Sequence, residues 1–236
     1  MADGQFEQIP WEAPEGMALG RNIRHDPRNR RHALPRRAAP TSAIRHRNYG
    51  RKLNQGDLGA CTGFAGAHCL NFSPLRQKVR PKATCGYGHA LDFYRGATRK
   101  DPFPGEWEPD DTGSSGQGVC EAMVEWGFAS GYKWAFGYDH GLEQLAEGPL
   151  MIGTWWYEEM FFPDRRGMVQ PKGRRSGGHE TLWVGHDPQS QEDLFLNNWS
   201  PAWGLLGYFR MKSADTRSLI DEQDGDLVRP VIEWAG

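Results

Sequence analysis

Apolar and small residues recur at helical spacing in the first half of the chain. Residues 61–72, 88–99 and 115–126 each carry this pattern. Gly63 and Gly66 interrupt the first of these segments, and each glycine costs a helix interior roughly 1 kcal/mol relative to alanine. We therefore expect this helix to pack very closely against its neighbours at both positions.

The second half of the chain changes to short apolar or alternating runs bounded by glycine and proline. These runs predict strands over residues 150–156, 180–184, 193–197 and 207–211. Helices that come first and strands that come later are typical of an α+β protein. The expected architecture is a helical lobe over about 54–130 and a β-rich lobe over about 148–236, with a cleft between them.

The first 40 residues are rich in proline, arginine and charge, and they show little periodicity. We interpret residues 1–40 as an Arg/Pro-rich N-terminal arm and residues 41–236 as the domain. The arm is most simply a solvated extension, and partial ordering of the arm against the body is the alternative. Docking of the arm onto an acidic assembly partner is the less favoured interpretation.

Composition and charge exclude several classes of protein. Hydrophobic residues make up 38% of the chain and charged residues 25%, which is typical of a globular protein rather than a disordered one. The formal net charge of −2 gives no reason to expect a nucleic-acid or membrane partner. The sequence has no apolar run of about 18 residues and no recognisable signal peptide, so a cytoplasmic or virion-associated location is expected.

The chain has four cysteines, at positions 61, 69, 85 and 120, and no CxxC pair. The absence of that pair disfavours zinc and thioredoxin-like chemistry. Without a signal peptide, free thiols are expected rather than disulfides. No metal or cofactor is implied.

Cys61 stands where a nucleophile would gain most from its surroundings. Gly59 and Ala60 precede the first predicted helix, so Cys61 falls in the first turn, where the helix dipole favours a thiolate. Gln55 lies six residues earlier, and its amide could help the backbone N–H of Cys61 to hold an oxyanion. The simpler alternatives are a buried apolar thiol at Cys61 and an ordinary turn residue at Gln55.

Two later segments supply the groups that such a thiol needs. Gly178 and His179 belong to the first, and the second begins Asn197-Asn198-Trp199. A histidine could act as base, and an asparagine could fix the tautomer of its ring. A lone histidine is more often structural, as we expect for His68 and His186, and the two asparagines are ambiguous by one place.

Taken together, these segments resemble the papain family of cysteine peptidases. The match rests on the stretch NQGDLGAC, which ends at Cys61, on the later His179 and on the block NNWSPAWGLLGYFRM, which begins at Asn197. The resemblance implies a papain-like two-lobed fold, with an N-terminal helical lobe and a barrel-like C-terminal lobe. It also implies hydrolysis of peptide bonds in a peptide or protein substrate through a Cys61 thioester.

The resemblance assigns a role to each matching residue. His179 would be the general base and then the acid, Asn197 its orienting partner and Gln55 the oxyanion donor. Trp199 would cover the hydrogen bond between Asn197 and His179. The remaining substrate-binding positions are Gly113 and Ser114, which match the family's loop that pairs with extended substrates, and Gly178.

Several positions depart from the family's pattern. Leu58 stands where secreted members have a cysteine, Thr62 replaces an aromatic residue, and Gly178 stands where a polar residue is common. None of these changes removes a catalytic atom. The residues before Gln55 are too few for a separate inhibitory domain, so control through location, the arm or a partner is expected.

Two other functions are compatible with the same residues. One is a non-catalytic structural or peptide-binding module of a larger assembly such as a virion. The other is an amide hydrolase or acyltransferase that acts on cell-wall peptides, because the pocket and not the nucleophile selects the acceptor.

Overall fold

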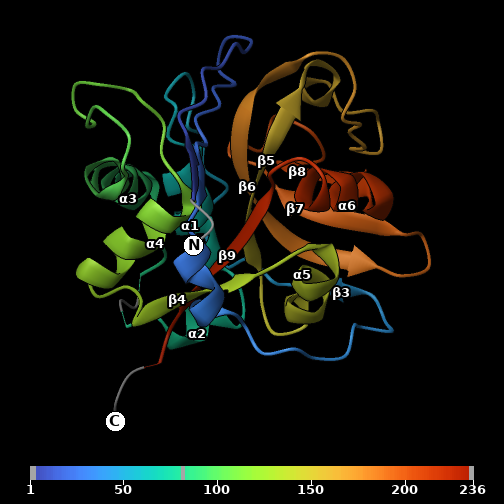
Figure 1. Cartoon of the computed structure of the whole chain (residues 1–236). Coiled ribbons are helices and arrows are strands. Elements are labelled where there is room, and N and C mark those ends of the chain that lie inside the picture. Colours follow the sequence, from blue (N-terminus) through green and yellow to red (C-terminus); the bar gives the residue numbers. More distant parts are fainter. Residues whose placement is uncertain (1–3, 81–82, 234–236) are drawn as a thin grey trace.

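The computed structural model describes residues 4–80 and 83–233. The helices of the first half are α1 (Cys61–Asn71), α2 (Leu75–Lys78), α3 (Tyr87–Lys100) and α4 (Gly116–Glu125). The three long helices predicted there are confirmed to within about one residue at each end. They lie together on one side of the molecule, and most of the sheet lies on the other (Figure 1).

The small residues of α1 allow the close packing expected of them. A Cβ atom built on Gly63 would lie 2.3 Å from the carbonyl oxygen of Ala90 on α3. One built on Gly66 would lie 2.4 Å from the methyl group of Met123 on α4. A side chain at either position would clash with the neighbouring helix. The two glycines therefore allow α3 and α4 to pack closely against α1, the buried helix that begins at Cys61.

The C-terminal half is built on one antiparallel sheet. The strands in the order β4-β9-β5-β6-β7-β8 are hydrogen-bonded neighbours, and β3 pairs with β6. Their bounds are β3 (Ile44–Arg45), β4 (Gly131–Ala135), β5 (Leu150–Tyr157), β6 (Arg175–Asp187), β7 (Glu192–Leu196), β8 (Tyr208–Lys212) and β9 (Asp226–Val231). The predicted runs correspond to β5, the middle of β6, β7 and β8, whereas β4 and β9 were not predicted.

Four shorter elements and two further helices complete the described chain. They are β1 (Gln5–Glu7), β2 (Ile23–His25), the 3-10 helices η1 (Pro27–His32) and η2 (Glu158–Phe161), α5 (Tyr138–Leu145) and α6 (Ser213–Asp221). The buried apolar side chains form two clusters, one around α1, α3 and α4 and one between the sheet, α5 and α6. This division agrees with the expected α+β, two-lobed architecture.

His68 on α1 is a structural histidine, as expected. Its Nε2 accepts from the backbone N–H of Leu53 (3.0 Å), so its Nδ1 carries the hydrogen and donates to Oδ1 of Asn198 (3.1 Å). Burial lowers the pKa of His68 to about 4 from an ordinary 6.5. The imidazole therefore stays neutral in the folded protein over a range of pH in which an exposed one is charged.

This depressed pKa predicts a pH-dependent contribution to stability. Above pH 6.5 the ring is neutral in both states, so its contribution is complete. As the pH falls from 6.5 to about 4 only the unfolded chain takes up the proton, so the folded state loses stability. His68→Gln keeps a donor and an acceptor without titrating. Urea unfolding at pH 7 and pH 4.5 should show on the order of 2 kcal/mol less acid destabilisation in this variant. Equal losses in both proteins would contradict the prediction.

Candidate active site

Cys61 is the first residue of α1 and is completely buried. Its Sγ accepts a hydrogen bond from the backbone N–H of Glu180, 3.4 Å away on β6. Burial raises the pKa of the Cys61 thiol far above its usual range, and the N–H of Glu180 opposes that rise. Cys61 is therefore a neutral thiol in this form of the protein, although it lies at a helix N-terminus.

His179 lies on β6, next to the residue that donates to Cys61. Its Nε2 is 2.8 Å from Oδ1 of Asn197, an oxygen that can only accept, so the hydrogen of the neutral ring resides on Nε2. Nδ1 is left as the basic nitrogen and has no hydrogen-bond partner among the described residues. Burial lowers the pKa of His179 to about 4.

Two tryptophans enclose this imidazole. The ring of Trp199 stacks on His179 with 4.6 Å between centroids and 19° between planes. The ring of Trp156 meets it edge-on at 4.9 Å. Trp199 thus lies against the histidine as the resemblance implied, and the apolar rings keep water away from the His179–Asn197 hydrogen bond.

The two neighbouring asparagines have different partners. Asn197 faces His179, whereas Nδ2 of Asn198 donates to the carbonyl oxygens of Cys61 (3.1 Å) and Glu180 (2.8 Å). Asn198 therefore joins α1 to β6. The geometry resolves the one-residue ambiguity in favour of Asn197 as the partner of the histidine.

Gln55 lies beside these residues, and its backbone N–H donates to the carbonyl of Asn198. Its Nε2 donates to the carbonyl oxygens of Ala18 (3.0 Å) and Leu58 (2.9 Å). Ala18 belongs to the N-terminal arm, and the same oxygen also accepts from the indole N–H of Trp199. The side-chain amide of Gln55, which the resemblance assigned to oxyanion binding, is therefore already hydrogen-bonded to the arm carbonyl of Ala18.

The arm continues between the two lobes. The backbone N–H groups of Gly20 and Arg21 both donate to the carbonyl of Gly178. On the other side Ser114 donates to Gly20 and accepts from Asn22. Figure 1 shows this blue segment running between the helices and strands β5 and β6. The expectation of a solvated arm is wrong for residues 18–23, which are buried, and the alternative of an arm partly ordered against the body agrees with the structure there.

Glycines line the passage that the arm follows. A Cβ on Gly178 would lie 2.1 Å from the carbonyl oxygen of Arg21, and one on Gly113 would lie 2.4 Å from that of Gly20. Gly113 also has φ of +70°, which favours glycine. Gly113, Ser114 and Gly178, three of the four positions predicted to bind substrate, thus all contact one peptide segment, which is the chain's own arm. The fourth position, Trp199, also donates to the arm carbonyl of Ala18.

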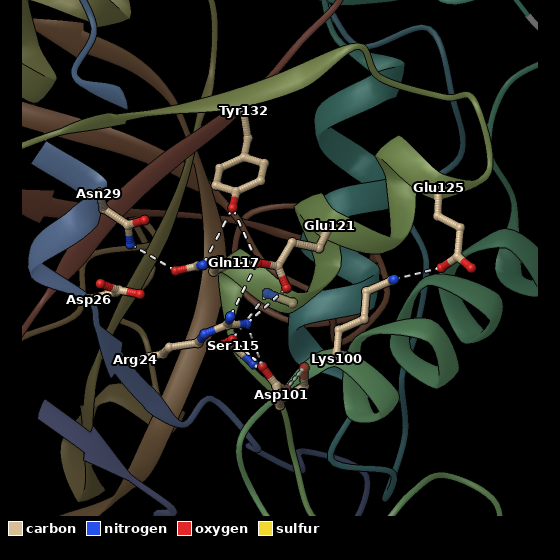
Figure 2. Close-up of polar contacts among 12 residues, drawn as sticks. Arg24, Asp26, Asn29, Lys100, Asp101, Ser115, Gln117, Glu121, Glu125 and Tyr132 are labelled. Atoms are coloured by element: carbon tan, nitrogen blue, oxygen red, sulfur yellow. Dashed lines mark hydrogen bonds and ion pairs between the residues drawn. The ribbon is translucent and has the colours of Figure 1, made fainter. Parts of the chain in front are cut away.

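A polar network fixes the arm to the helices beyond this point (Figure 2). Arg24 pairs with Glu121 on α4 at 3.0 Å and with Asp101 at 3.4 Å. Asp101 in turn accepts from the hydroxyl groups of Ser114 and Ser115. The arm and the Ser114 loop therefore share one anchor, in which burial raises the pKa of Asp101 to about 6.

Sequence reasoning missed three charged residues next to the site. Arg21, Glu180 and Asp226 are buried, with Glu180 immediately after the predicted base. An acidic residue directly after His179 in an otherwise apolar strand was the available signal. The position of Arg21 depends on the path of the arm, which no local pattern shows.

Within the described ranges, no group of three or more His, Cys, Asp or Glu side chains is arranged to hold a metal ion. All four cysteines are free thiols, as expected. Among the helices of the described chain, none has the length and apolar character needed to cross a bilayer.

Known proteins resemble this chain in fold and, more weakly, in sequence. A model of the papain family of cysteine proteases matches residues 136–224. Xylellain, a cysteine protease from Xylella fastidiosa, superposes with a TM-score of 0.74 at 17% identity, over 99% of this chain and 100% of that one. Digestive procathepsin L 3 of Tenebrio molitor superposes with a TM-score of 0.63 at 13% identity, over 92% of this chain and 76% of that one.

Sequence relatives agree with this resemblance. Cathepsin B-like CP3 of Giardia intestinalis is 26% identical over 200 residues, which are 72% of this chain and 67% of that protein. Cathepsin B-like CP2 of the same organism is 23% identical over 205 residues, which are again 72% of this chain and 67% of that protein. The chain accordingly has a papain-like fold, and its sequence resembles papain-family cysteine proteases over residues 136–224.

Proposed function

We propose that this protein is a cysteine peptidase that hydrolyses peptide bonds through a thioester on Cys61, and that its N-terminal arm keeps it latent. The observation that carries the proposal is the hydrogen bond from His179 Nε2 to Asn197. This hydrogen bond leaves Nδ1 as the basic nitrogen of the ring. The next residue in the sequence, Glu180, donates its backbone N–H to Cys61 Sγ, so the imidazole and the thiol belong to neighbouring parts of one site.

In the proposed reaction Nδ1 of His179 takes the proton of the Cys61 thiol, and the thiolate attacks the carbonyl carbon of the scissile peptide. The Gln55 amide and the backbone N–H of Cys61 hold the oxyanion. His179 then gives its proton to the leaving amine as the C–N bond breaks, which leaves a thioester. Water, deprotonated by His179, attacks the thioester, the C–S bond breaks to release the carboxylic acid product, and His179 returns the proton to the Cys61 sulfur.

The arm has to leave before a substrate can enter. It occupies the Gln55 donor through Ala18 and the main-chain partners Gly178 and Ser114 through residues 20–22. The same burial holds Cys61 and His179 in their neutral forms. With the arm released, water and substrate reach both groups, and their pKa values return toward values that suit the chemistry.

The test is alkylation of the reduced full chain by a thiol-directed epoxide of the E-64 type, with the modified residue located by mass spectrometry. Wild type and Arg21→Ala, which weakens the arm, are compared with His179→Ala and Cys61→Ala in the Arg21→Ala background. We expect modification of Cys61 alone, slowed by on the order of 100-fold or more without His179.

Cys69 and Cys120 serve as internal controls in this experiment, because they are buried free thiols that the proposed reaction does not use. If Cys61 reacts no faster than these thiols in the Arg21→Ala chain, the site has no activated nucleophile. A non-catalytic binding module would then be the better interpretation.

A further inference from the structure

Arg21 is a completely buried arginine that lies in the cleft. The exposed fraction of its side chain is 0%. Its Nη2 pairs with Oδ2 of Asp226 at 2.5 Å and donates to the backbone carbonyl of Asp224 at 2.7 Å. A guanidinium without water needs such partners, because an unpaired buried charge is very costly.

A second carboxylate, that of Glu180, lies near the same guanidinium. The register of the sheet places Glu180 and Asp226 on either side of Gly153, so the three lie in one row across β6, β5 and β9. A Cβ built on Gly153 would lie 2.6 Å from Nε of Arg21, 2.8 Å from Glu180 Oε2 and 2.9 Å from Asp226 Oδ1. Because Gly153 has no side chain, a space remains beside the two carboxylates, and the guanidinium of Arg21 fills this space.

Arg21 of the arm does not satisfy all the hydrogen-bonding atoms of the two carboxyl groups. Both carboxylate oxygens of Glu180, Oδ1 of Asp226 and two nitrogens of Arg21 have no hydrogen-bond partner in the described chain. Burial and the neighbouring Asp226 raise the pKa of Glu180, and Arg21 lowers it. Two carboxylates in one dry pocket repel each other, so the pocket favours a cationic occupant.

The pocket also lies where a substrate side chain would enter. Glu180 donates its backbone N–H to the Cys61 thiol, so the wall of the pocket that Glu180 forms lies directly beside the nucleophile. The main chain of Arg21 lies between Gly178 and Ser114, whose backbone groups bond to the arm there. A substrate that used those same backbone groups would direct a side chain into the space that Arg21 now fills.

We propose that Glu180 and Asp226 form a specificity pocket for a basic side chain of the substrate, arginine above all, and that Arg21 occupies it in the latent chain. This rests on the peptidase function proposed above. Arginine is favoured over lysine because its planar fork can face both carboxylates and the Asp224 carbonyl together. A neutral side chain would leave buried carboxylates without a counter-charge.

The experiment uses peptidyl vinyl sulfones in which one of the three residues before the reactive group is varied. At each position arginine is compared with citrulline, which has the same shape without the charge. Modification rates of Cys61 are measured in the full-length Arg21→Ala chain, alone and with Asp226→Asn or Glu180→Gln. The control is Asp224→Asn, which removes an exposed carboxylate two residues away and keeps the carbonyl that Arg21 contacts.

All probes require the same opening of the arm, so the ratio of arginine to citrulline rates within one protein cancels that step. We expect a ratio of about 10 or more at one position, which falls toward 1 in Asp226→Asn and Glu180→Gln and persists in Asp224→Asn. A ratio near 1 at all three positions, with Cys61 modified, would overturn the specificity and leave the peptidase proposal standing. A preference that survives both pocket variants would overturn the assignment to these carboxylates. Failure of every probe to modify Cys61 would overturn the proposed function itself.

Discussion

Replacing Arg21 with alanine should raise the rate at which Cys61 of the full-length chain reacts with an epoxide by on the order of 100-fold or more. The ion pair between Arg21 and Asp226 is buried, and removal of one partner leaves the other charge in the dry pocket. That penalty falls only on the form in which the arm covers the pocket. The equilibrium therefore shifts toward the open form, in which the thiol is accessible.

Arg28→Ala is the matched control for this experiment. Arg28 lies seven residues further along the same arm and pairs with Asp26, but its side chain is 74% exposed. Exposed ion pairs contribute only about 0–1 kcal/mol, so its removal should change the rate less than about fivefold. Equal rates for wild type and Arg21→Ala, with both proteins folded by circular dichroism, would mean that Arg21 does not hold the cleft closed.

The local sequence predicted the elements that present the site, for physical reasons that are easy to state. Helix α1 and strand β5 consist mostly of apolar or small residues, so composition and run length locate them. Strand β9 contains Pro230 and was missed, because a proline within a run argues against a strand. Helix α6 begins with polar residues and packs only one side on the core, so its pattern is weak.

The candidate site was predictable only as far as the motif reached. Cys61, His179 and Asn197 come from segments distant in sequence, and the fold brings them together. The pocket that contains Glu180 and Asp226 depends on the register of three strands across Gly153. Register is set by tertiary packing rather than by composition, so no single-sequence pattern could place the two carboxylates in one row.

The path of the arm is the largest difference between expectation and structure. Its composition is typical of a solvated segment, and most of its arginines are exposed or half-buried. Arg21 is buried because the domain offers a charged pocket and backbone partners such as Gly178. These partners are separated from it by more than half the chain, so only the folded structure reveals the contact.

Alanine substitution at the two adjacent asparagines should separate catalysis from stability. Asn198 receives a hydrogen bond from His68 and donates to the carbonyls of Cys61 and Glu180, all within the buried interior. Asn198→Ala leaves these groups unpaired at about 1–3 kcal/mol each, a large part of the 5–15 kcal/mol that typically holds a domain folded. The expected result is a large drop in the urea midpoint, or failure to fold.

Asn197→Ala should have the opposite profile. Asn197 acts through His179 as a positioning residue, and its Nδ2 has no partner in the described part of the chain to lose. We expect a folded protein whose Cys61 reacts about 100-fold more slowly at pH 7 in the Arg21→Ala background, because the ring no longer keeps its hydrogen on Nε2. This deficit should shrink toward pH 9, where solvent deprotonates an ordinary thiol without a base. A deficit that does not change with pH would indicate damage to the fold, and unchanged reactivity would show that His179 needs no partner to act.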